Sequence, residues 1–401
     1  MSRRQERRAR RRRRIKLAFA LLFLPALLEL ASYLAGRVLQ SRWVMYADPI
    51  QSSGRRQARD YEHYLQLRDP LLGWPYPREL GGEGYLADGS IPLPANQELA
   101  GVARHVTLYG DSFTWGLTNA TPEQCWANQL ARGLGEPVKN FAVPGYGTDQ
   151  AYLRFLRNAD DRGRVVVMGH MAEDVSRNLT RLRDFTAGGG QGFSFKPRFV
   201  LGPDGALQLV PLPSLSAAEY RRLLALDQPQ LVLEHECFHP GGPLGTVRLE
   251  PPFSLALLRN LGYFRLRSRL GGYPEYAPLY APDHPLGGLQ LTRAILLAFQ
   301  REAERRGQRP LVVLFPGPAD AMYAQRTGQR ILDGLEGDLV AAGVDVLDFT
   351  PLLLEWLGPR PAAEAFANSH FAPEVEPLVA RAVLERIRGV ADHAAADHGG
   401  R

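Results

Sequence analysis

A serine that follows a short apolar run is the first residue in this sequence that could carry out chemistry. Residues 105–109 (His-Val-Thr-Leu-Tyr) are typical of a buried strand, and Gly110, Asp111 and Ser112 follow them at once. A serine at the carboxyl end of a strand stands where open α/β sheets place their ligands. Gly, Asp and Ser also favour ordinary turns, so the tripeptide alone would fit a turn that merely ends a strand. The segments that follow favour the catalytic interpretation.

A glycine-containing loop behind the next predicted strand could bind an oxyanion. Residues 138–142 predict that strand, and residues 143–150 (Val-Pro-Gly-Tyr-Gly-Thr-Asp-Gln) follow it, with Gly145 early in the loop. A glycine lets its backbone N–H approach a reacting carbonyl without obstruction by a side chain. By itself, the loop would also fit an ordinary turn from a strand into a helix.

A histidine near the carboxyl end is a candidate general base. His370 lies in residues 368–374 (Asn-Ser-His-Phe-Ala-Pro-Glu), just before the last predicted helix. An imidazole suits proton transfer because its ordinary pKa lies near neutrality. Two alternatives stay open: His370 only caps that helix, or His284 in residues 282–285 (Pro-Asp-His-Pro) is the base.

These segments together resemble the SGNH hydrolases, also called the GDSL esterase family. The resemblance covers about residues 100–390 and is interrupted by an insertion. Residues 110–116 (Gly-Asp-Ser-Phe-Thr-Trp-Gly) are similar to the family's nucleophile block, residues 140–150 to its glycine block, and residues 368–374 to its terminal block. Some membrane-anchored polysaccharide acetyltransferases of this superfamily carry a similar Asp-x-His-Trp form of the last block.

The resemblance implies a role for each candidate residue. Ser112 would be the nucleophile, the backbone N–H groups of Ser112 and Gly145 would hold the oxyanion, and His370 would be the general base. No cofactor and no metal are implied, because this chemistry needs only side chains and backbone amides. The implied partner is an ester- or acyl-bearing substrate, and analogy with exported family members suggests an O-acetylated cell-surface or exported glycan.

Two positions depart from the family's pattern. The Asp that orients the imidazole has no counterpart, and Asn368 could accept an imidazole N–H bond through its amide oxygen in its place. An amide would stabilise an imidazolium less than a carboxylate does. Asp174 stands at the position of the oxyanion-binding Asn, where an ionised carboxylate would repel the oxyanion. A protonated Asp174 or the nearby Asn178 could substitute as the donor.

The sequence therefore predicts a serine esterase or an O-acyltransferase, which differ in whether water or a sugar hydroxyl accepts the acyl group. The departures keep a second hypothesis open, a catalytically degenerate relative that binds glycan or scaffolds an envelope assembly. A nucleotide-binding flavodoxin-like domain is disfavoured, because the sequence has no Gly-x-Gly-x-x-Gly or Gly-Lys-Ser/Thr loop and Asp111 would repel phosphate.

The N-terminus combines a basic cluster with an apolar run. Residues 1–14 hold nine arginines and one acid, which leaves the rest of the chain at about −2 and argues against a nucleic-acid binder. Ten Leu and Phe residues in 17–36 favour membrane insertion by on the order of 3–6 kcal/mol, against about 2.5–3.5 kcal/mol for burying Glu29. We predict a single-pass anchor at 15–37 in the cell membrane, with the N-terminus cytoplasmic and the main domain outside. A cleaved signal peptide is the alternative.

The rest of the chain predicts a three-layer α/β/α fold with a mostly parallel, flavodoxin-like sheet. We expect a stalk or entry segment at 38–100 that becomes ordered as it meets the main domain, the hydrolase-like domain at 101–390, and a flexible tail at 391–401. An insertion at about 185–288, with a β-hairpin at 199–210 around Pro-Asp-Gly, would form a lid or substrate platform, or else a flap that only stabilises. The expected strands are 105–109, 138–142, 165–168, 311–315 and 345–349, and the expected helices are 122–133, 149–158, 289–306, 329–342 and 373–388.

The chain has only two cysteines, Cys125 and Cys237. Two are too few for a disulfide framework or a cysteine-based metal site. No spacing signal connects them, so we expect them to remain unpaired.

Overall fold

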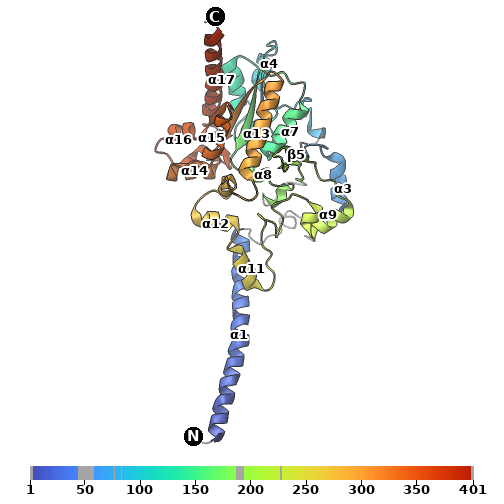
Figure 1. Ribbon diagram of the computed structural model, residues 1–401. Helices are drawn as coiled ribbons and strands as arrows, with labels where there is room; N and C mark the ends of the chain where they lie inside the picture. The colour runs from blue at the N-terminus through green and yellow to red at the C-terminus, as the bar shows by residue number, and fades with distance from the viewer. Residues whose placement is uncertain are drawn as a thin grey trace.

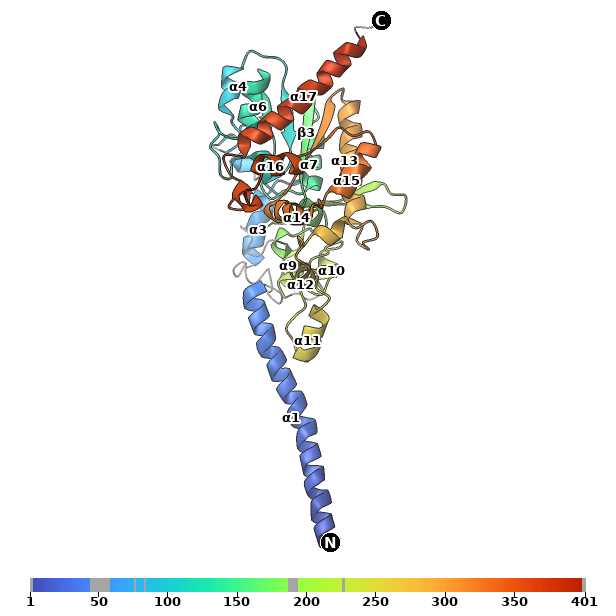
Figure 2. The ribbon, with the colours of Figure 1, turned by 90° about the vertical axis from the view of Figure 1, so that its left-hand side faces the viewer.

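The protein consists of a long N-terminal helix joined to an α/β domain (Figure 1). Helix α1 (Arg3–Trp43) projects from one end of the domain, and α17 (Glu376–His398) projects from the opposite end (Figure 2). The computed structural model describes residues 3–43, 58–75, 77–82, 84–186, 194–225 and 228–398.

Five parallel strands form the central sheet in the order β2-β1-β3-β6-β7. Counted along the chain, this is the 2-1-3-4-5 order of flavodoxin-like sheets, whose order reverses beside the first strand. Val106 pairs with Val138 on one side and with Val165 on the other. The predicted parallel sheet is confirmed, with strand ends shifted by a few residues. The strands are β1 (Val106–Tyr109), β2 (Val138–Asn140), β3 (Val165–Met171), β6 (Arg309–Phe315) and β7 (Val346–Asp348).

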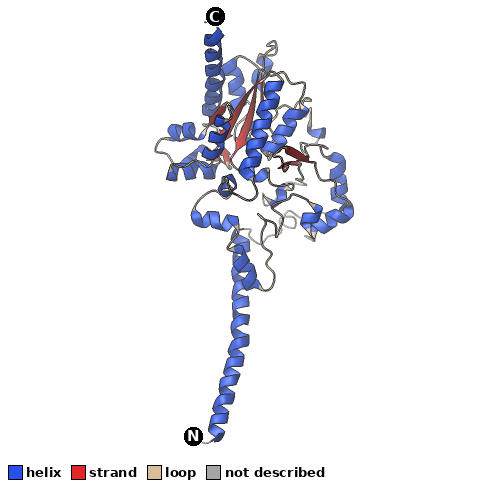
Figure 3. Ribbon diagram, viewed as in Figure 1, coloured by secondary structure: helices blue, strands red, loops and turns tan. Residues whose placement is uncertain are grey.

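Helices cover both faces of this sheet and complete the predicted three layers (Figure 3). Side chains alternate between the faces of a strand, so the neighbours Val167 and Met168 of β3 belong to two separate hydrophobic cores. The Val167 core includes α6 (Trp126–Leu134), α16 (Thr350–Leu357) and α17, and the Met168 core includes α7 (Thr148–Arg157), α13 (Gly288–Arg305) and α15 (Asp333–Ala341).

Residues on both sides of the predicted domain at 101–390 are ordered and adjoin it. Residues from Ala58 onward belong to the core, since α3 (Ala58–Leu67) carries the fully buried Tyr61, which stacks on Tyr220 with ring centroids 4.3 Å apart. Part of the predicted stalk at 38–100 is therefore an integral part of the domain, while residues 44–57 lie outside the described residues. Of the predicted tail, residues 391–398 continue helix α17.

The insertion between β3 and α13 contains the predicted hairpin. Strands β4 (Arg198–Leu201) and β5 (Leu207–Val210) pair antiparallel around residues 202–206. The chain then continues through four helices, α9 (Ala217–Leu224), α10 (Pro229–Val232), α11 (Phe253–Asn260) and α12 (Phe264–Gly271). The remaining elements are α4 (Pro94–Glu98), α5 (Ser112–Trp115), α8 (Asp174–Arg177), α14 (Pro318–Thr327), β8 (Phe366–Ala367), β9 (His370–Phe371) and the 3₁₀ turns η1 (Pro77–Glu79), η2 (Arg183–Phe185), η3 (Ala277–Tyr280) and η4 (Ala362–Ala365).

A fully buried ion pair fixes the insertion to the first turn of α7. Lys196 Nζ lies 2.5 Å from Asp149 Oδ2 and also donates to the carbonyl oxygens of Arg177 (3.0 Å) and Pro197 (2.9 Å). Burial lowers the pKa of Lys196 to about 8, and the Asp149 carboxylate opposes that shift. Breaking such a pair would leave one charge buried without a partner.

Lys196→Met should therefore lower the free energy of unfolding by about 3–5 kcal/mol, as measured by denaturant titration in detergent. Lys139→Met is the control, because Lys139 and Asp88 form an exposed pair 3.8 Å apart and its loss should cost less than about 1 kcal/mol. Equal effects of the two substitutions would contradict the assigned role of the buried pair.

Candidate active site

Ser112 stands at the junction of β1 and the short helix α5. The carboxylate of Asp111 caps this helix by accepting a hydrogen bond from the backbone N–H of Phe113 (2.9 Å). A side chain at Gly110 would collide with Thr114, so the turn requires glycine at this point. The result is a sharp strand-to-helix turn with the serine in its first helical position.

The structure brings Ser112 and His370 together, although 258 residues separate them. His370 Nε2 lies 2.8 Å from Ser112 Oγ, and Nδ1 lies 2.9 Å from the backbone oxygen of Asn368. A carbonyl can only accept, so the proton of the neutral imidazole resides on Nδ1. Nε2 is then free to accept the Ser112 hydroxyl proton, which is the arrangement that a general base requires.

The small hairpin of β8 and β9 places His370. Its turn residues, Asn368 and Ser369, have φ of 45° and 62°, a left-handed backbone that costs non-glycine residues on the order of 1–3 kcal/mol. Asn119 holds the hairpin by donating to the carbonyl oxygens of Ala367 (2.6 Å) and Phe371 (2.9 Å). The strained turn aims the Asn368 carbonyl at the imidazole.

The expected role of Asn368 needs a correction. The sequence suggested that its amide oxygen would accept from the imidazole, but its side chain instead donates to Asn119 Oδ1 (3.0 Å). The backbone carbonyl of Asn368 makes the contact with His370. Side-chain identity at this position therefore matters for holding the turn and not for the contact itself.

Gly145 lies in the loop that follows β2, at the same edge of the sheet as Ser112. Its φ of 81° favours glycine, and the loop is fixed because Val143 N donates to Gly110 O (3.1 Å) and Trp74 Nε1 donates to Pro144 O (3.1 Å). Within the described part of the chain, no group accepts a hydrogen bond from the backbone N–H of Gly145 or of Ser112. Both donors are available to a bound oxyanion.

Asp174 and Asn178 are engaged elsewhere in the fold. Asp174 Oδ2 accepts from the backbone N–H of Met171 (3.3 Å). Asn178 is fully buried; its amide donates to Thr292 Oγ1 (3.1 Å) and accepts from Asp149 N (3.1 Å), which fixes it between α7 and α13. One N–H of the Asn178 amide is thus engaged by Thr292, and the role of Asn178 as the oxyanion donor stays a prediction.

Arg177, which the sequence analysis did not single out, connects the loops behind three strands. Its Nη1 donates to Asp111 Oδ2 (3.1 Å) behind β1 and to the backbone oxygen of Tyr146 (2.9 Å) behind β2. The same Nη1 lies 2.9 Å from Asp174 Oδ1 behind β3. In the sequence, Arg177 lies four residues after Glu173 and three after Asp174, and this spacing was a signal that could have indicated ion pairs with them.

The buried carboxylates around Arg177 compete for one positive charge. Burial raises the pKa of Asp174 well above its usual value, and the neighbouring Asp111 raises it further, while Arg177 opposes both effects. The shift favours the protonated form of Asp174.

A cavity of about 460 Å³ lies beside His370. The insertion forms one wall of it through residues 268–269 and 273–276, and the start of α14 forms another. Three aromatic side chains, Phe113, Tyr273 and Tyr276, and the guanidinium group of Arg177 are among the groups that line it. The insertion thus contributes directly to the space next to the Ser112 and His370 pair.

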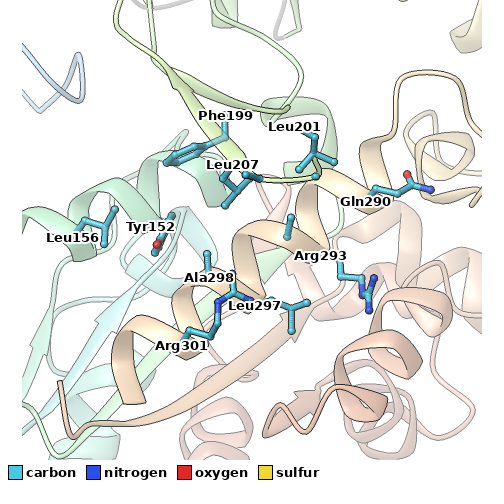
Figure 4. Close-up of a pocket in the computed structure, with 13 residues that line it drawn as sticks. Tyr152, Leu156, Phe199, Leu201, Leu207, Gln290, Arg293, Leu297, Ala298 and Arg301 are labelled. Atoms are coloured by element: carbon cyan, nitrogen blue, oxygen red, sulfur yellow. The ribbon is translucent and has the colours of Figure 1, made fainter. Parts of the chain in front are cut away.

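A larger cavity, about 540 Å³, lies elsewhere (Figure 4). In Figure 4, Phe199 and Leu207 of the β4–β5 hairpin lie opposite Leu297 and Arg293 of α13. Neither Ser112 nor His370 lines this groove. His370 lines the smaller cavity.

The other expectations concern His284, the cysteines and metals. His284 Nδ1 accepts a hydrogen bond from Leu286 N (3.3 Å), and the Ser112 hydroxyl contacts His370 instead. Cys125 is buried and Cys237 half-buried, and both are free thiols. Among the residues that the structure describes, no group of three His, Cys, Asp or Glu side chains is placed to hold a metal ion.

Comparison with known proteins gives matches among solved structures only. No family model and no curated protein match the sequence. A member of the lipolytic G-D-S-L family from Veillonella parvula matches at 10% identity and a TM-score of 0.37, over 71% of this chain and 97% of that one. The esterase EstA from Pseudoalteromonas sp. matches at 9% identity and 0.35, over 72% and 99%. The acetyl xylan esterase Est2A from Butyrivibrio proteoclasticus matches at 10% and 0.32, over 72% and 64%.

These matches concern the fold alone. All identities are at or below 10% and all TM-scores are below 0.4, so the roles of individual residues rest on the chemistry of this chain.

Removing the guanidinium group should disrupt the site through its buried carboxylates. Arg177→Met leaves Asp111 and Asp174 without their positive partner and should lower the free energy of unfolding by about 3–5 kcal/mol. Adding Asp174→Asn should restore part of that loss. Arg293→Met, which breaks an exposed pair with Asp338, is the control and should cost less than about 1 kcal/mol by the same denaturant titration. A loss no greater than that control would refute the role of Arg177.

A second prediction concerns pH and Glu376, which lines a small cavity together with Ser112. Burial raises the pKa of Glu376 to about 8, and its Oε2 accepts from Trp126 N (2.8 Å). The folded state therefore holds a proton that the unfolded state releases near pH 4.5. The stability of the native protein should fall as pH rises from about 4.5 to 8, by at most about 1.4 kcal/mol per pH unit from this group.

Glu376→Gln removes that titration, so the variant should gain stability relative to the native protein as pH rises through this window. Thermal unfolding at pH 5, 6.5 and 8 measures the difference. Parallel pH profiles for the two proteins would show that Glu376 ionises normally in the fold.

Proposed function

We propose that this protein is a serine esterase or O-acyltransferase of the SGNH type. The observation that supports this most directly is the contact of 2.8 Å between His370 Nε2 and Ser112 Oγ, with Nδ1 held by a backbone carbonyl. A role as a cap of the last helix would not require the unprotonated nitrogen of the histidine to face a serine hydroxyl. The pair lies beside a cavity that could admit an ester.

In the proposed reaction, Ser112 Oγ attacks the ester carbonyl while His370 Nε2 takes the hydroxyl proton. The backbone N–H groups of Ser112 and Gly145 donate to the oxyanion of the tetrahedral intermediate. His370 then returns the proton to the leaving alkoxide, and the acyl group remains on Ser112. Water or a sugar hydroxyl next attacks the acyl-enzyme and loses its proton to His370, which passes that proton to Ser112 Oγ as the acyl–oxygen bond breaks.

The contact between His370 and the Asn368 carbonyl takes the place of the usual carboxylate in this scheme. A neutral carbonyl fixes the tautomer and the ring orientation, as a carboxylate does, but it offers less stabilisation to the imidazolium. Phe113 stacks on the imidazole with ring centroids 5.2 Å apart and restricts its rotation further. The proposed catalyst is thus a Ser-His dyad with a backbone orienter.

The proposed substrate is an O-acetylated glycan outside the cell. Tyr273 and Tyr276, which line the cavity beside His370, offer aromatic surfaces of the kind on which sugar rings pack, and Arg177 and Arg269 add hydrogen-bond donors. We also propose that α1 is an uncleaved anchor, since the stretch Arg11–Leu39 is long and apolar enough to cross a membrane. By the positive-inside rule, the arginine-rich N-terminus would be cytoplasmic.

Ser112→Ala should abolish hydrolysis of p-nitrophenyl acetate, a fall of several orders of magnitude in kcat, and labelling by a fluorophosphonate probe. Ser176→Ala is a matched control, because Ser112 and Ser176 are both 7% exposed. His370→Ala should suppress labelling as well, since the hydroxyl loses its base.

An unlabelled native protein, with a turnover that Ser112→Ala leaves unchanged, would eliminate the esterase proposal. Glycan binding that persists in such a protein would favour the alternative, a degenerate binding relative. The observation behind that alternative is Asp174, which stands where a donor to the oxyanion is expected.

A further inference from the structure

Helix α11 of the insertion is attached to helix α1 through an acidic residue. Glu29 of α1 accepts hydrogen bonds from the backbone N–H groups of Phe253 (2.5 Å) and Ser254 (3.1 Å), and from the Ser254 hydroxyl. These groups form the first turn of α11, where backbone N–H groups lack partners within the helix and the helix dipole is positive. The Glu29 carboxylate therefore caps α11.

The contact continues along α1 beyond this cap. The rings of Tyr33 and Phe253 lie with centroids 5.0 Å apart, and a side chain at Gly36 would collide with Leu249. Leu39 packs against a small cluster formed by Tyr263 and Leu266. Figures 1 and 2 show α11 beside the end of α1 that faces the domain.

The outer face of α11 is apolar and uncovered. Leu255, Leu258 and Leu261 are 38%, 63% and 61% exposed, at a spacing of three residues that places them on one side of the helix. We call these three leucines of α11 the leucine face. On α1, Leu30 and Leu34, which follow Glu29 and Tyr33 in the sequence, are 54% and 55% exposed.

We propose that the leucine face lies in the outer leaflet of the lipid bilayer, so that α11 is a membrane-immersed part of the insertion. This inference rests on the proposal that α1 spans the membrane. About 20 residues cross the hydrocarbon core, and the apolar run that begins at Leu17 reaches that length at Gly36. Glu29 precedes Gly36 by seven residues, about 10 Å along a helix, which agrees with the roughly 5–10 Å depth of interfacial helices.

Lipid fits the leucine face better than a protein partner does. The face belongs to a helix that packs on α1 through Glu29 and Tyr33, and α1 is itself proposed to contact lipid. Arg259 and Arg267, which are exposed on α11 and α12, could extend to the phosphate groups of lipids, because long basic side chains place their charges at the interface. A carboxylate within a membrane span is costly unless it has partners, and the N-terminus of α11 supplies them to Glu29.

The immersed helix is connected to the candidate active site. Only three residues separate α11 from α12, and Ser268 and Arg269 of α12 line the cavity beside His370. The cavity is thereby held near the membrane surface. A substrate would then have to reach the site at that surface, as a polymer attached to or emerging from the membrane does.

Spin labels in the full chain, reconstituted into phosphatidylcholine and phosphatidylglycerol vesicles, test this inference. Leu258→Cys carries the label in a Cys237→Ser background, in which Cys125 is buried. Leu22→Cys, 75% exposed on α1, and Val340→Cys, 57% exposed on α15, are the lipid and water references. The labels at 258 and at 22 should both collide with oxygen several-fold more often than with a water-soluble nickel chelate. The label at 340 should collide more often with the nickel chelate than with oxygen.

The references separate the possible failures. A label at 22 that meets the nickel chelate would refute the anchor, whereas a label at 22 in lipid with one at 258 in water would refute only the immersion of α11. Shielding of position 258 from both reagents would mean a protein contact and would also overturn the inference. Turnover of p-nitrophenyl acetate, measured on the same samples, reports the proposed chemistry independently.

Variants at Glu29 test the cap. Glu29→Ala should make the α1 segment more apolar and keep position 22 in lipid, yet release α11, so that the nickel chelate reaches the label at 258 several-fold more often. Glu29→Gln retains an acceptor and should have a smaller effect. An unchanged depth at 258 in Glu29→Ala would show that the cap does not hold α11.

Discussion

The site depends on the contacts that the guanidinium group of Arg177 makes with three loops. Three loops follow β1, β2 and β3 at the same edge of the sheet, and each presents oxygen atoms inward: the Asp111 carboxylate, the Tyr146 carbonyl and the Asp174 carboxylate. Two buried carboxylates so close together would repel each other without a cation between them. Arg177 satisfies all three loops, and in doing so it fixes the turn that carries Ser112 and the loop that carries Gly145.

The imidazole is oriented by backbone rather than by a second carboxylate. Two consecutive residues, Asn368 and Ser369, adopt a left-handed backbone, and Asn119 compensates by bonding both strands of the hairpin. Backbone strain of this kind persists only where the surroundings hold it, and it is common where geometry matters for function. In the proposed enzyme, a carbonyl held by a strained turn replaces the acidic third member of a catalytic triad.

Glu29, an acidic residue within the apolar run of α1, also has hydrogen-bond partners that compensate for its charge. Glu29 weakens α1 as a membrane span, yet it caps α11 and so joins the N-terminal helix to the insertion. The insertion in turn forms a wall of the cavity beside His370 and is fixed to α7 by the buried pair of Lys196 and Asp149. The segment between β3 and α13 thus connects the proposed anchor, the cavity and the sheet.

The sequence by itself determined the parallel sheet and the hairpin, and it placed Ser112 and Gly145 in turns behind strands, because strand periodicity and the turns around glycine are encoded by neighbouring residues. It did not determine which groups would meet around them. Asn178 is bound to Thr292, 114 residues away, and Asn368 acts through its carbonyl because Asn119 holds its side chain. Arg177 and Glu29 find partners 66 and 225 residues distant. Such partners are set by the packing of whole elements, which only the tertiary structure decides.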